Sequence, residues 1–305
     1  MSERKPAQES PALVHALSVD VEDWHNAAEL LTTGRVRPPT EAVVRLTHLL
    51  FDLLAEHAVQ ATWFFLGEVA EAYPGLVRMV VDAGHEVGVH GFHHHRVHEL
   101  APEAHHRSIQ RARTLIEDVA GCPVLGYRAV AMSIGPGTWY ALDAAARAGF
   151  TYDSSLFPFR GPVYGAPGTP VEPHWRLTES GRWIFEVPLT VLEVGSLRLP
   201  CCGGGYLRHF PLHYTELMLR ALAHQQRPAV FYLHPYELDS DPHAAHPPAG
   251  MRFAQRLRFA KLRHFQYRNR SHTLSKLDSL LGRHRFAPIA EVFDIAQRRP
   301  PTSRV

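Results

Sequence analysis

The sequence contains few cysteines and no long apolar run. Its three cysteines, Cys122, Cys201 and Cys202, are an odd number with two adjacent, which excludes a disulfide framework and is typical of a reducing compartment. No stretch approaches the roughly 18 apolar residues that a membrane-spanning helix needs. Residues 1–11 are polar and lack the apolar core of a secretion signal. We therefore expect a cytoplasmic protein without stable membrane insertion.

The sequence also lacks an excess of either charge. Lys and Arg number 32 against 30 Asp and Glu, so the formal net charge is +2. This balance indicates neither a nucleic-acid partner nor an anionic membrane surface as partner. Histidine, in contrast, is abundant, with 22 residues. Because the reference pKa of histidine is roughly 6.5, the net charge should rise as the pH falls below neutral.

Short apolar runs alternate with segments of helical periodicity. Buried strands are predicted at residues 13–19, 61–66, 87–89, 150–155 and 229–233. Helices are predicted to begin at Thr40, a typical N-cap residue, and at Pro74 and Pro102. This alternation predicts βα units around a mainly parallel sheet. No repeat or linker divides the chain, so we expect one domain over residues 12–295 between disordered ends at 1–11 and 296–305.

Polar residues follow several of these strands. Acidic residues come directly after the first apolar run, and His90 and His94 lie in a histidine-rich stretch after the third. A carboxylate at the end of a buried strand is costly unless it is paired or binds a metal. In parallel α/β folds ligands bind at the carboxyl ends of strands. Two histidines with a carboxylate suit a catalytic Zn²⁺, Fe²⁺ or Co²⁺, whereas the alternative is a set of solvated histidines and capping acids.

Seven motifs in this order resemble those of the NodB-type polysaccharide deacetylases, carbohydrate esterase family 4. They are SVDVEDW at 18–24, ATWFFLG at 61–67, GHEVGVHGFHH at 84–94, GYRA at 126–129, YDSSLFP at 152–158, GGGY at 203–206 and FYLHPYE at 231–237. The DVEDW start is most similar to the subgroup found with exosortase A and exopolysaccharide gene clusters. The resemblance implies a distorted (β/α)7-type barrel, the NodB homology fold, in one domain with a C-terminal extension over about residues 240–295.

The resemblance also implies the roles of individual residues. Asp20 maps to the general base, Arg128 to the arginine that orients it, and His234 to the general acid. His90 and His94 map to two metal ligands. The third ligand is an acid of the first motif, where the family has adjacent aspartates but this chain has two intervening residues. We expect Asp23 to be this ligand, with Glu22 as the alternative.

Further residues are expected to contact the substrate. Trp24 and Tyr206 are candidates for stacking on sugar rings, although aromatic residues more often belong to the core. Tyr152, Asp153 and Ser154 belong to the motif that would supply a backbone N–H to the developing oxyanion.

The implied function is a metal-dependent hydrolase that removes N-acetyl groups from an amino-sugar glycan. The absence of an export signal favours an intermediate of exopolysaccharide biosynthesis as the substrate. Zinc is the expected cofactor, and Co²⁺ or Ni²⁺ would suit the same ligands. Two alternatives stay open: an amidase acting on a small cyclic amide, similar to the cofactor-independent allantoinases, and a catalytically silent glycan-binding module.

Overall fold

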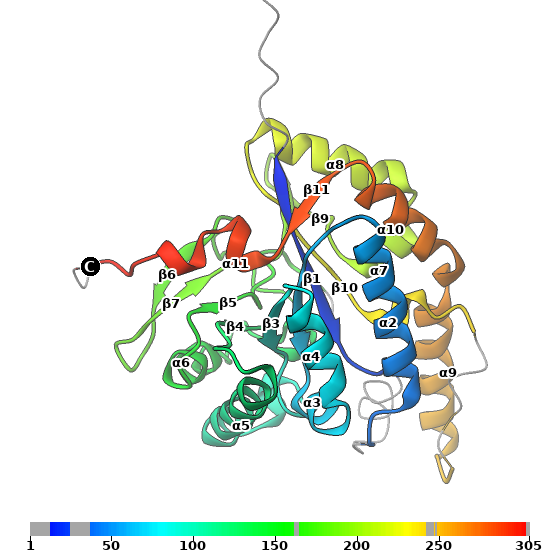
Figure 1. Ribbon diagram of the computed structural model, residues 1–305, viewed down its shortest axis with the longest axis horizontal. Helices are drawn as coiled ribbons and strands as arrows, with labels where there is room; N and C mark the ends of the chain where they lie inside the picture. The colour runs from blue at the N-terminus through cyan, green and yellow to red at the C-terminus, as the bar shows by residue number, and fades with distance from the viewer. Residues whose placement is uncertain (1–12, 25–36, 162–164, 242–246, 248, 303–305) are drawn as a thin grey trace, which may run out of the picture.

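The computed structural model describes residues 13–24, 37–161, 165–241, 247 and 249–302. Of the segments expected to be disordered, residues 1–11 and 303–305 lie outside these ranges. Residues 296–302 are described, and Ala296 and Gln297 belong to a 3-10 helix. The described part forms one α/β domain in which a curled, mainly parallel sheet is surrounded by helices (Figure 1).

Seven parallel strands form the body of the sheet. In spatial order they are β10 (Val230–Leu233), β1 (Val14–Val21), β2 (Thr62–Phe65), β3 (Glu86–Val89), β4 (Gly126–Tyr127), β5 (Tyr152–Asp153) and β7 (Trp183–Glu186). β6 (His174–Leu177) pairs antiparallel with β7 at one edge, and β11 (Arg285–Ala287) pairs with the first residues of β1. Among the described residues the two edges of this sheet do not pair, so the sheet is a half-barrel. The predicted (β/α)7-type fold is confirmed.

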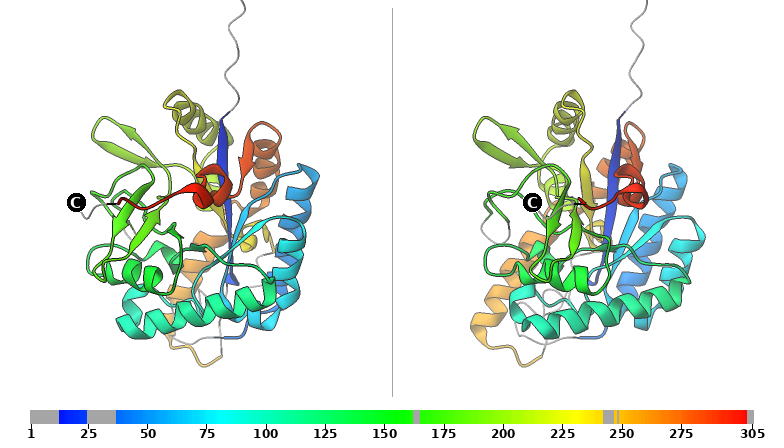
Figure 2. Two further views of the ribbon diagram at one scale, coloured as in Figure 1. Left: turned by 60° about the vertical axis from the view of Figure 1, so that its left-hand side comes forward. Right: turned by 90° about the vertical axis from the view of Figure 1, so that its left-hand side faces the viewer.

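Most helices pack on the outer, convex side of the curled sheet, as the two turned views show (Figure 2), whereas the short helix α11 (Ile289–Val292) packs with Ile289 against the core inside the curl. Those of the first half are α2 (Glu41–Glu56), α3 (Gly67–Ala72), α4 (Pro74–Asp82), α5 (Pro102–Ala120) and α6 (Tyr140–Arg147). Those of the second half are α7 (Gly204–His209), α8 (Leu212–His224), α9 (Phe253–Tyr267), α10 (Thr273–Leu281) and α11 (Ile289–Val292). Short 3-10 helices are η1 (Val97–Glu99), η2 (Val130–Met132), η3 (Pro235–Leu238), η4 (Arg270–His272) and η5 (Ile295–Gln297). No helix in the described ranges is long and apolar enough to cross a lipid bilayer.

Residues along β1 alternate between two buried environments. Leu17, Val19 and Val21 belong to the large core between the sheet and its helices. Ala16 belongs to a second core inside the curl. Because successive side chains of a strand point to opposite faces, the even-numbered positions, including Asp20, project into the interior of the half-barrel. This alternation decides which acids of the first motif can reach the site.

Most predicted elements are present. Thr40 caps α2 as predicted, since its Oγ1 accepts a hydrogen bond from the Ala42 N–H at 3.3 Å. A hairpin of β8 (Val191–Val194) and β9 (Leu197–Pro200) forms a separate two-stranded sheet.

A candidate metal and acid–base site

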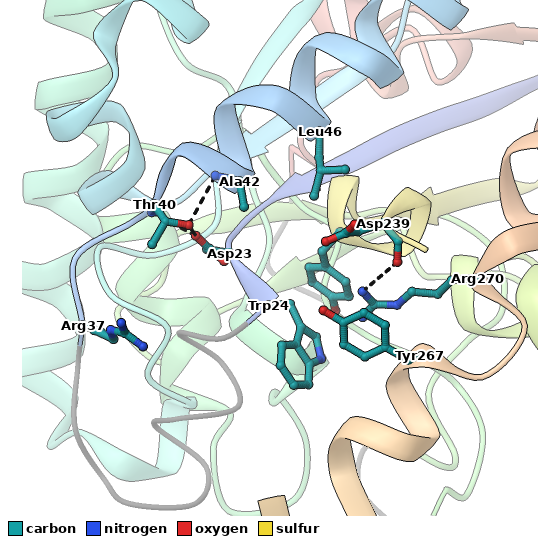
Figure 3. Close-up of a pocket in the computed structure, with 10 residues that line it drawn as sticks. Asp23, Trp24, Arg37, Thr40, Ala42, Leu46, Asp239, Tyr267 and Arg270 are labelled. Atoms are coloured by element: carbon teal, nitrogen blue, oxygen red, sulfur yellow. Dashed lines mark hydrogen bonds between the residues drawn. The ribbon is translucent and has the colours of Figure 1, made fainter. Parts of the chain in front are cut away.

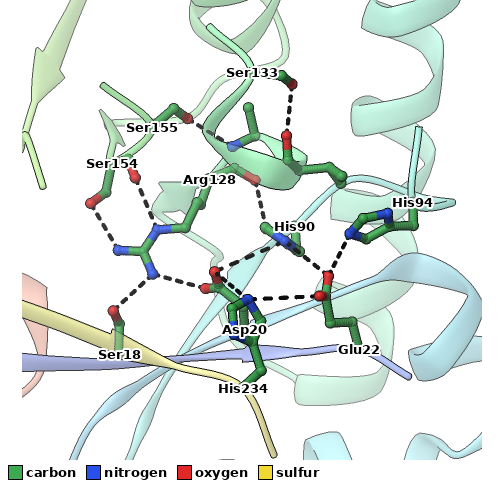
Figure 4. Close-up of polar contacts among 12 residues, drawn as sticks. Ser18, Asp20, Glu22, His90, His94, Arg128, Ser133, Ser154, Ser155 and His234 are labelled. Atoms are coloured by element: carbon green, nitrogen blue, oxygen red, sulfur yellow. Dashed lines mark hydrogen bonds and ion pairs between the residues drawn. The ribbon is translucent and has the colours of Figure 1, made fainter. Parts of the chain in front are cut away.

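Polar side chains from several neighbouring strands converge at the carboxyl end of the half-barrel (Figure 4). Asp20 lies on β1, and the other four residues follow directly after strands β1, β3, β4 and β10: Glu22, His90, Arg128 and His234. Parallel pairing aligns these strand ends, because Asp20 is opposite Phe64 of β2 and Val19 is opposite Leu233 of β10. The sequence motifs are therefore gathered into one place by the order of the strands.

Glu22, His90 and His94 form a compact group of three buried side chains that could hold a metal ion. One ligand atom from each lies within 4.8 Å of the other two. Glu22 Oε2 is 2.8 Å from His94 Nε2 and 3.4 Å from His90 Nε2. Burial alone would raise the pKa of Glu22, but the charges of His94 and His234 and polar contacts from both neighbouring histidines hold that pKa well below its usual range. Glu22 is thus an ionised, inward-facing carboxylate.

The ring of His90 is oriented by the backbone. Its Nδ1 lies 3.0 Å from the carbonyl oxygen of Arg128, so the proton sits on Nδ1 and Nε2 presents a lone pair to Glu22. Gly91 follows with a φ of 98°, a backbone conformation that glycine adopts without strain, and the chain turns there so that His94 faces the same point.

The donor set fits a divalent cation. A nitrogen lone pair and a carboxylate oxygen repel each other at 3.4 Å unless a cation or a proton lies between them. Twelve buried polar atoms among the described residues have no hydrogen-bond partner of good geometry, and two of them, Glu22 Oε2 and Asp20 Oδ2, lie in this site. Buried polar groups are rarely left unsatisfied, so these two carboxylate oxygens indicate a missing ligand. Two nitrogens and one carboxylate oxygen suit Zn²⁺, Co²⁺ or Fe²⁺.

The structure does not bring Asp23 to this group, contrary to the sequence-based expectation. Asp23 Oδ2 accepts hydrogen bonds from the backbone N–H of Thr40 at 2.9 Å and from its hydroxyl at 2.6 Å, at the start of α2. The alternation that begins in β1 explains the difference: Asp20 and Glu22 point inward, whereas Asp23 points to the opposite side. Glu22, the alternative, therefore takes the place next to the histidines.

Arg128 holds Asp20 inside the domain. Both side chains are fully buried, and Arg128 Nη1 is 2.8 Å from Asp20 Oδ1. Nη1 also donates to Ser18 Oγ, whereas Nε donates to the carbonyl oxygen of Ser154 and Nη2 to its hydroxyl. The guanidinium lies 4.4 Å above the ring of Phe64. Only Oδ2 of Asp20 is left to act, at 3.9 Å from His234 Nε2 and 4.0 Å from His90 Nε2.

His234 is fixed by a residue that the sequence analysis did not single out. Glu237 Oε2 lies 3.3 Å from His234 Nδ1 and accepts a hydrogen bond from the His234 backbone N–H at 3.1 Å. Tyr236 stacks on the imidazole ring at 4.7 Å. Burial alone would lower the pKa of His234, but the hydrogen bond to Glu237 and the charges of Glu22, Glu237 and Asp20 raise it to about 9. His234 is therefore a cation at neutral pH. The three-residue spacing between His234 and Glu237 at the start of η3 was the available signal for this pair.

Three of the expected substrate contacts are enclosed. Tyr152 and Ser154 have no exposed surface; their hydroxyls are held by Glu86 at 2.8 Å and by Arg128 at 3.0 Å. Asp153 is equally buried and accepts two hydrogen bonds from Ser155. These side chains support the site from beneath and offer no surface to a glycan.

The two aromatic candidates lie closer to the surface. Trp24 is 5% exposed, packs edge-on against Phe259 and Tyr267, and lines a cavity of about 170 Å³ (Figure 3). Tyr206 is partly buried against Phe157 and Phe210. Sugar stacking by Trp24 and Tyr206 stays a prediction.

Two family models match the chain. The polysaccharide deacetylase model matches residues 40–152, and the model of a domain of unknown function (DUF3473) matches residues 154–294. The peptidoglycan deacetylase of Helicobacter pylori is 33% identical over 112 residues, which is 35% of this chain and 36% of that protein. The peptidoglycan-N-acetylglucosamine deacetylase of Bacillus cereus is 30% identical over 97 residues, 32% of this chain and 34% of that protein. The chain thus matches about a third of the length of these relatives.

Among solved structures, a Mycobacterium smegmatis protein assigned as a polysaccharide deacetylase has a TM-score of 0.57 at 20% identity. This similarity covers 100% of our chain and 97% of that one, and it concerns the fold alone. The match to the polysaccharide deacetylase model is thus confined to residues 40–152, a little over a third of the chain. The second half matches a family whose function has not been assigned.

Proposed function

We propose that this protein is a metal-dependent hydrolase that removes N-acetyl groups from an amino-sugar glycan. The observation that carries the proposal is the convergence of a carboxylate with a free oxygen, a histidine cation and a group of three residues that could hold a metal ion. His234 Nε2 lies within 4 Å of both Asp20 Oδ2 and the Glu22 carboxylate. His90 Nε2 lies within 4 Å of the same two side chains. Relatives named peptidoglycan and chitooligosaccharide deacetylases support the same chemistry.

Glu22, His90 and His94 would hold the divalent cation. When bound, such a cation polarises the amide carbonyl and lowers the pKa of water. We propose Zn²⁺ for this position, with Co²⁺ or Ni²⁺ as substitutes.

Asp20 is the proposed general base. Arg128 occupies its Oδ1 and keeps the carboxylate aimed, so that Oδ2 alone faces the centre of the site and can accept a proton from water. Because Asp20 and Arg128 are both fully buried, this orientation is rigid. A positioned acid or base of this kind contributes on the order of 10²- to 10⁴-fold to the rate.

His234 is the proposed general acid. Its Nδ1 faces Glu237 and its Nε2 faces the site, so the proton on Nε2 is available to the departing amine. The pKa near 9 keeps the ring charged at neutral pH until the amine leaves. The breaking C–N bond then leaves acetate and a free amino sugar.

We further propose that the natural substrate is an intermediate of exopolysaccharide biosynthesis on the cytoplasmic side of the membrane. This proposal is supported by the DVEDW motif of residues 20–24, which resembles the exosortase A-associated subgroup.

The test combines metal content with acetate release from N-acetylglucosamine oligomers, with and without a chelator. We expect about one metal ion per chain and acetate release that a chelator abolishes and added Zn²⁺ restores. Metal without acetate release from any oligomer would contradict the glycan substrate, and acetate release unaffected by chelator would contradict the metal.

A further inference from the structure

The C-terminal part of the chain contains a segment with positive charge only. Residues 242–277 include eight Lys and Arg and no Asp or Glu, although the whole chain has nearly equal numbers of each. α9, residues 253–267, is the central element of this segment, and Arg252 and Arg268 flank it. The balanced composition of the whole chain therefore conceals a strongly basic helix.

The cations of this helix are exposed. Arg252, Arg256, Arg258, Lys261 and Arg268 all lie at the surface. Within the described part of the chain none of these five forms an ion pair with an acidic side chain. Their charge is therefore directed to solvent or to an external partner.

Large apolar side chains are exposed among these cations. Phe253 is 84% exposed, Leu257 63% and Phe265 56%. Together with Lys261 they form a series with a spacing of four residues, which places them along one side of the helix. Solitary exposed apolar residues are common, but three on one helix face surrounded by cations are typical of an interaction surface.

The opposite side of α9 attaches it to the domain. Phe259 is buried against Trp24, and Tyr267 packs edge-on against the same ring. Figure 1 shows α9 at the lower right edge of the molecule, beside α2. The exposed residues Phe253, Leu257 and Phe265 therefore belong to a helix whose other side is packed against the domain.

We propose that α9 binds the surface of an anionic lipid bilayer. Phe253, Leu257 and Phe265 enter the boundary between headgroups and acyl chains, and the surrounding Arg and Lys side chains contact lipid phosphates. A basic helix with Phe and Leu on one side is suited to this position in the plane of the membrane. A hydrated polyanion such as an acidic glycan or a nucleic acid satisfies the cations equally well, but it provides no apolar phase for three exposed hydrophobic side chains.

The position of α9 connects this surface with the candidate site. Trp24, which α9 covers, follows Glu22 by two residues, and Tyr236 belongs to the same aromatic cluster and stacks on His234. Membrane binding would therefore hold the carboxyl end of the half-barrel near the lipid surface. This attachment is peripheral, and it does not depend on the proposed hydrolysis.

The test is flotation of the purified full chain with vesicles of phosphatidylcholine, with or without phosphatidylglycerol. We expect binding to the anionic vesicles and little to the neutral ones. Raising the salt from about 0.1 M to 1 M, which shortens the Debye length from about 10 Å to 3 Å, should weaken the binding strongly.

Two paired variants separate the contributions. Arg256→Gln/Lys261→Gln should weaken binding about 25-fold, since each cation near an anionic surface contributes roughly fivefold. Phe253→Ser/Leu257→Ser should weaken vesicle binding at least tenfold, and the binding that is left should be more sensitive to salt. The matched controls, Arg78→Gln/Arg107→Gln and Leu217→Ser, change exposed residues on α4, α5 and α8 and should bind as the unchanged chain does.

Circular dichroism and the melting temperature establish that each variant is folded. Equal binding to neutral and anionic vesicles, no binding to either, or equal loss in the controls would overturn the proposal. Retention on heparin or dextran sulfate without vesicle flotation would overturn it in favour of a hydrated polyanion.

Discussion

At the scale of single residues, the site depends on which polar atom of each proposed proton carrier already has a partner. Arg128 engages Oδ1 of Asp20 and leaves Oδ2 free. Glu237 engages Nδ1 of His234 and leaves Nε2 free. Each proposed proton carrier is thus fixed on one side by a buried partner and open on the other. Such one-sided fixation gives a preorganised acid and base with little rotational freedom.

Replacing Asp20→Asn should separate chemistry from metal binding. The amide keeps the size of the side chain but cannot accept a proton, so we expect kcat to fall by about 10²- to 10⁴-fold. Metal content per chain should not change, because Asp20 lies outside the Glu22–His90–His94 group. The melting temperature serves as the control, because loss of a buried charge partner for Arg128 is destabilising. Unchanged turnover in a folded variant would refute the assignment of the base.

The pair Glu22→Gln and Asp23→Asn tests the choice between the two neighbouring acids. Glu22→Gln should lower the metal content and the activity together, because the neutral amide is a poor ligand for a divalent cation. Asp23→Asn should retain the metal and lose only part of the hydrogen bonding to Thr40, at a cost of about 1 kcal/mol. The measurement is metal stoichiometry by mass spectrometry, and the reverse pattern would restore Asp23 as the ligand.

At the scale of elements, α7 supports the general acid although it takes no part in the chemistry. Its first residue, Gly204, lies so close to Glu237 that a Cβ there would collide with the carboxylate. The next residue, Gly205, has open space at the same position. The start of α7 therefore fixes the position of Glu237, and Glu237 in turn fixes His234.

We expect Gly204→Ala to impair the site and Gly205→Ala to leave it intact. The new methyl group of Gly204→Ala displaces Glu237, so that the pKa of His234 falls from about 9 and the alkaline limb of the activity profile moves to lower pH. Gly205→Ala adds the same methyl group to the same helix and should stabilise it by up to about 1 kcal/mol. The comparison requires pH–rate profiles of both variants, and identical profiles would exclude this role of α7.

At the scale of the whole molecule, the amino end of the half-barrel contains histidines that need to be neutral. The Ala229 N–H donates to Nδ1 of His15, and the Ala61 N–H donates to Nδ1 of His85, each at 3.0 Å. Burial lowers the pKa of each ring to about 4, and a neighbouring His284 adds to the effect at His15. A protonated ring could not accept these hydrogen bonds. They connect the amino ends of neighbouring strands, β1 with β10 and β2 with β3.

The protein should therefore lose stability in mild acid. Between pH 6.5 and 4 these histidines bind protons in the unfolded chain but not in the folded one, so the free energy of unfolding decreases as the pH falls through this window. Each histidine contributes a slope of up to about 1.4 kcal/mol per pH unit. Urea unfolding at several pH values measures this slope, and His15→Gln/His85→Gln should flatten it. A stability that is constant from pH 7 to 4.5 would contradict the prediction.

The sequence by itself determined the order of strands and helices and most of the residues of the site. Apolar runs that are buried on both sides of a sheet and amphipathic helices leave a strong periodic signal, and the polar residues that end these runs stand out. Asp20, His90, His94, Arg128 and His234 were identified in this way and through the family resemblance, and the structure brings all five together.

Tertiary structure decided what depends on direction and on contacts between distant segments. Glu22, and not Asp23, lies next to His90 and His94 because it points to the inward side of the sheet. Which side of β1 faces inward is decided only when the strand is placed between its neighbours. The close contact between Gly204 and Glu237 forms only when α7 packs against η3. The pairing of His234 with Glu237 likewise depends on the folded chain. Likewise, periodicity alone does not tell which apolar residues of α9 are covered, because packing against Trp24 buries Phe259 and leaves Phe253 in solvent.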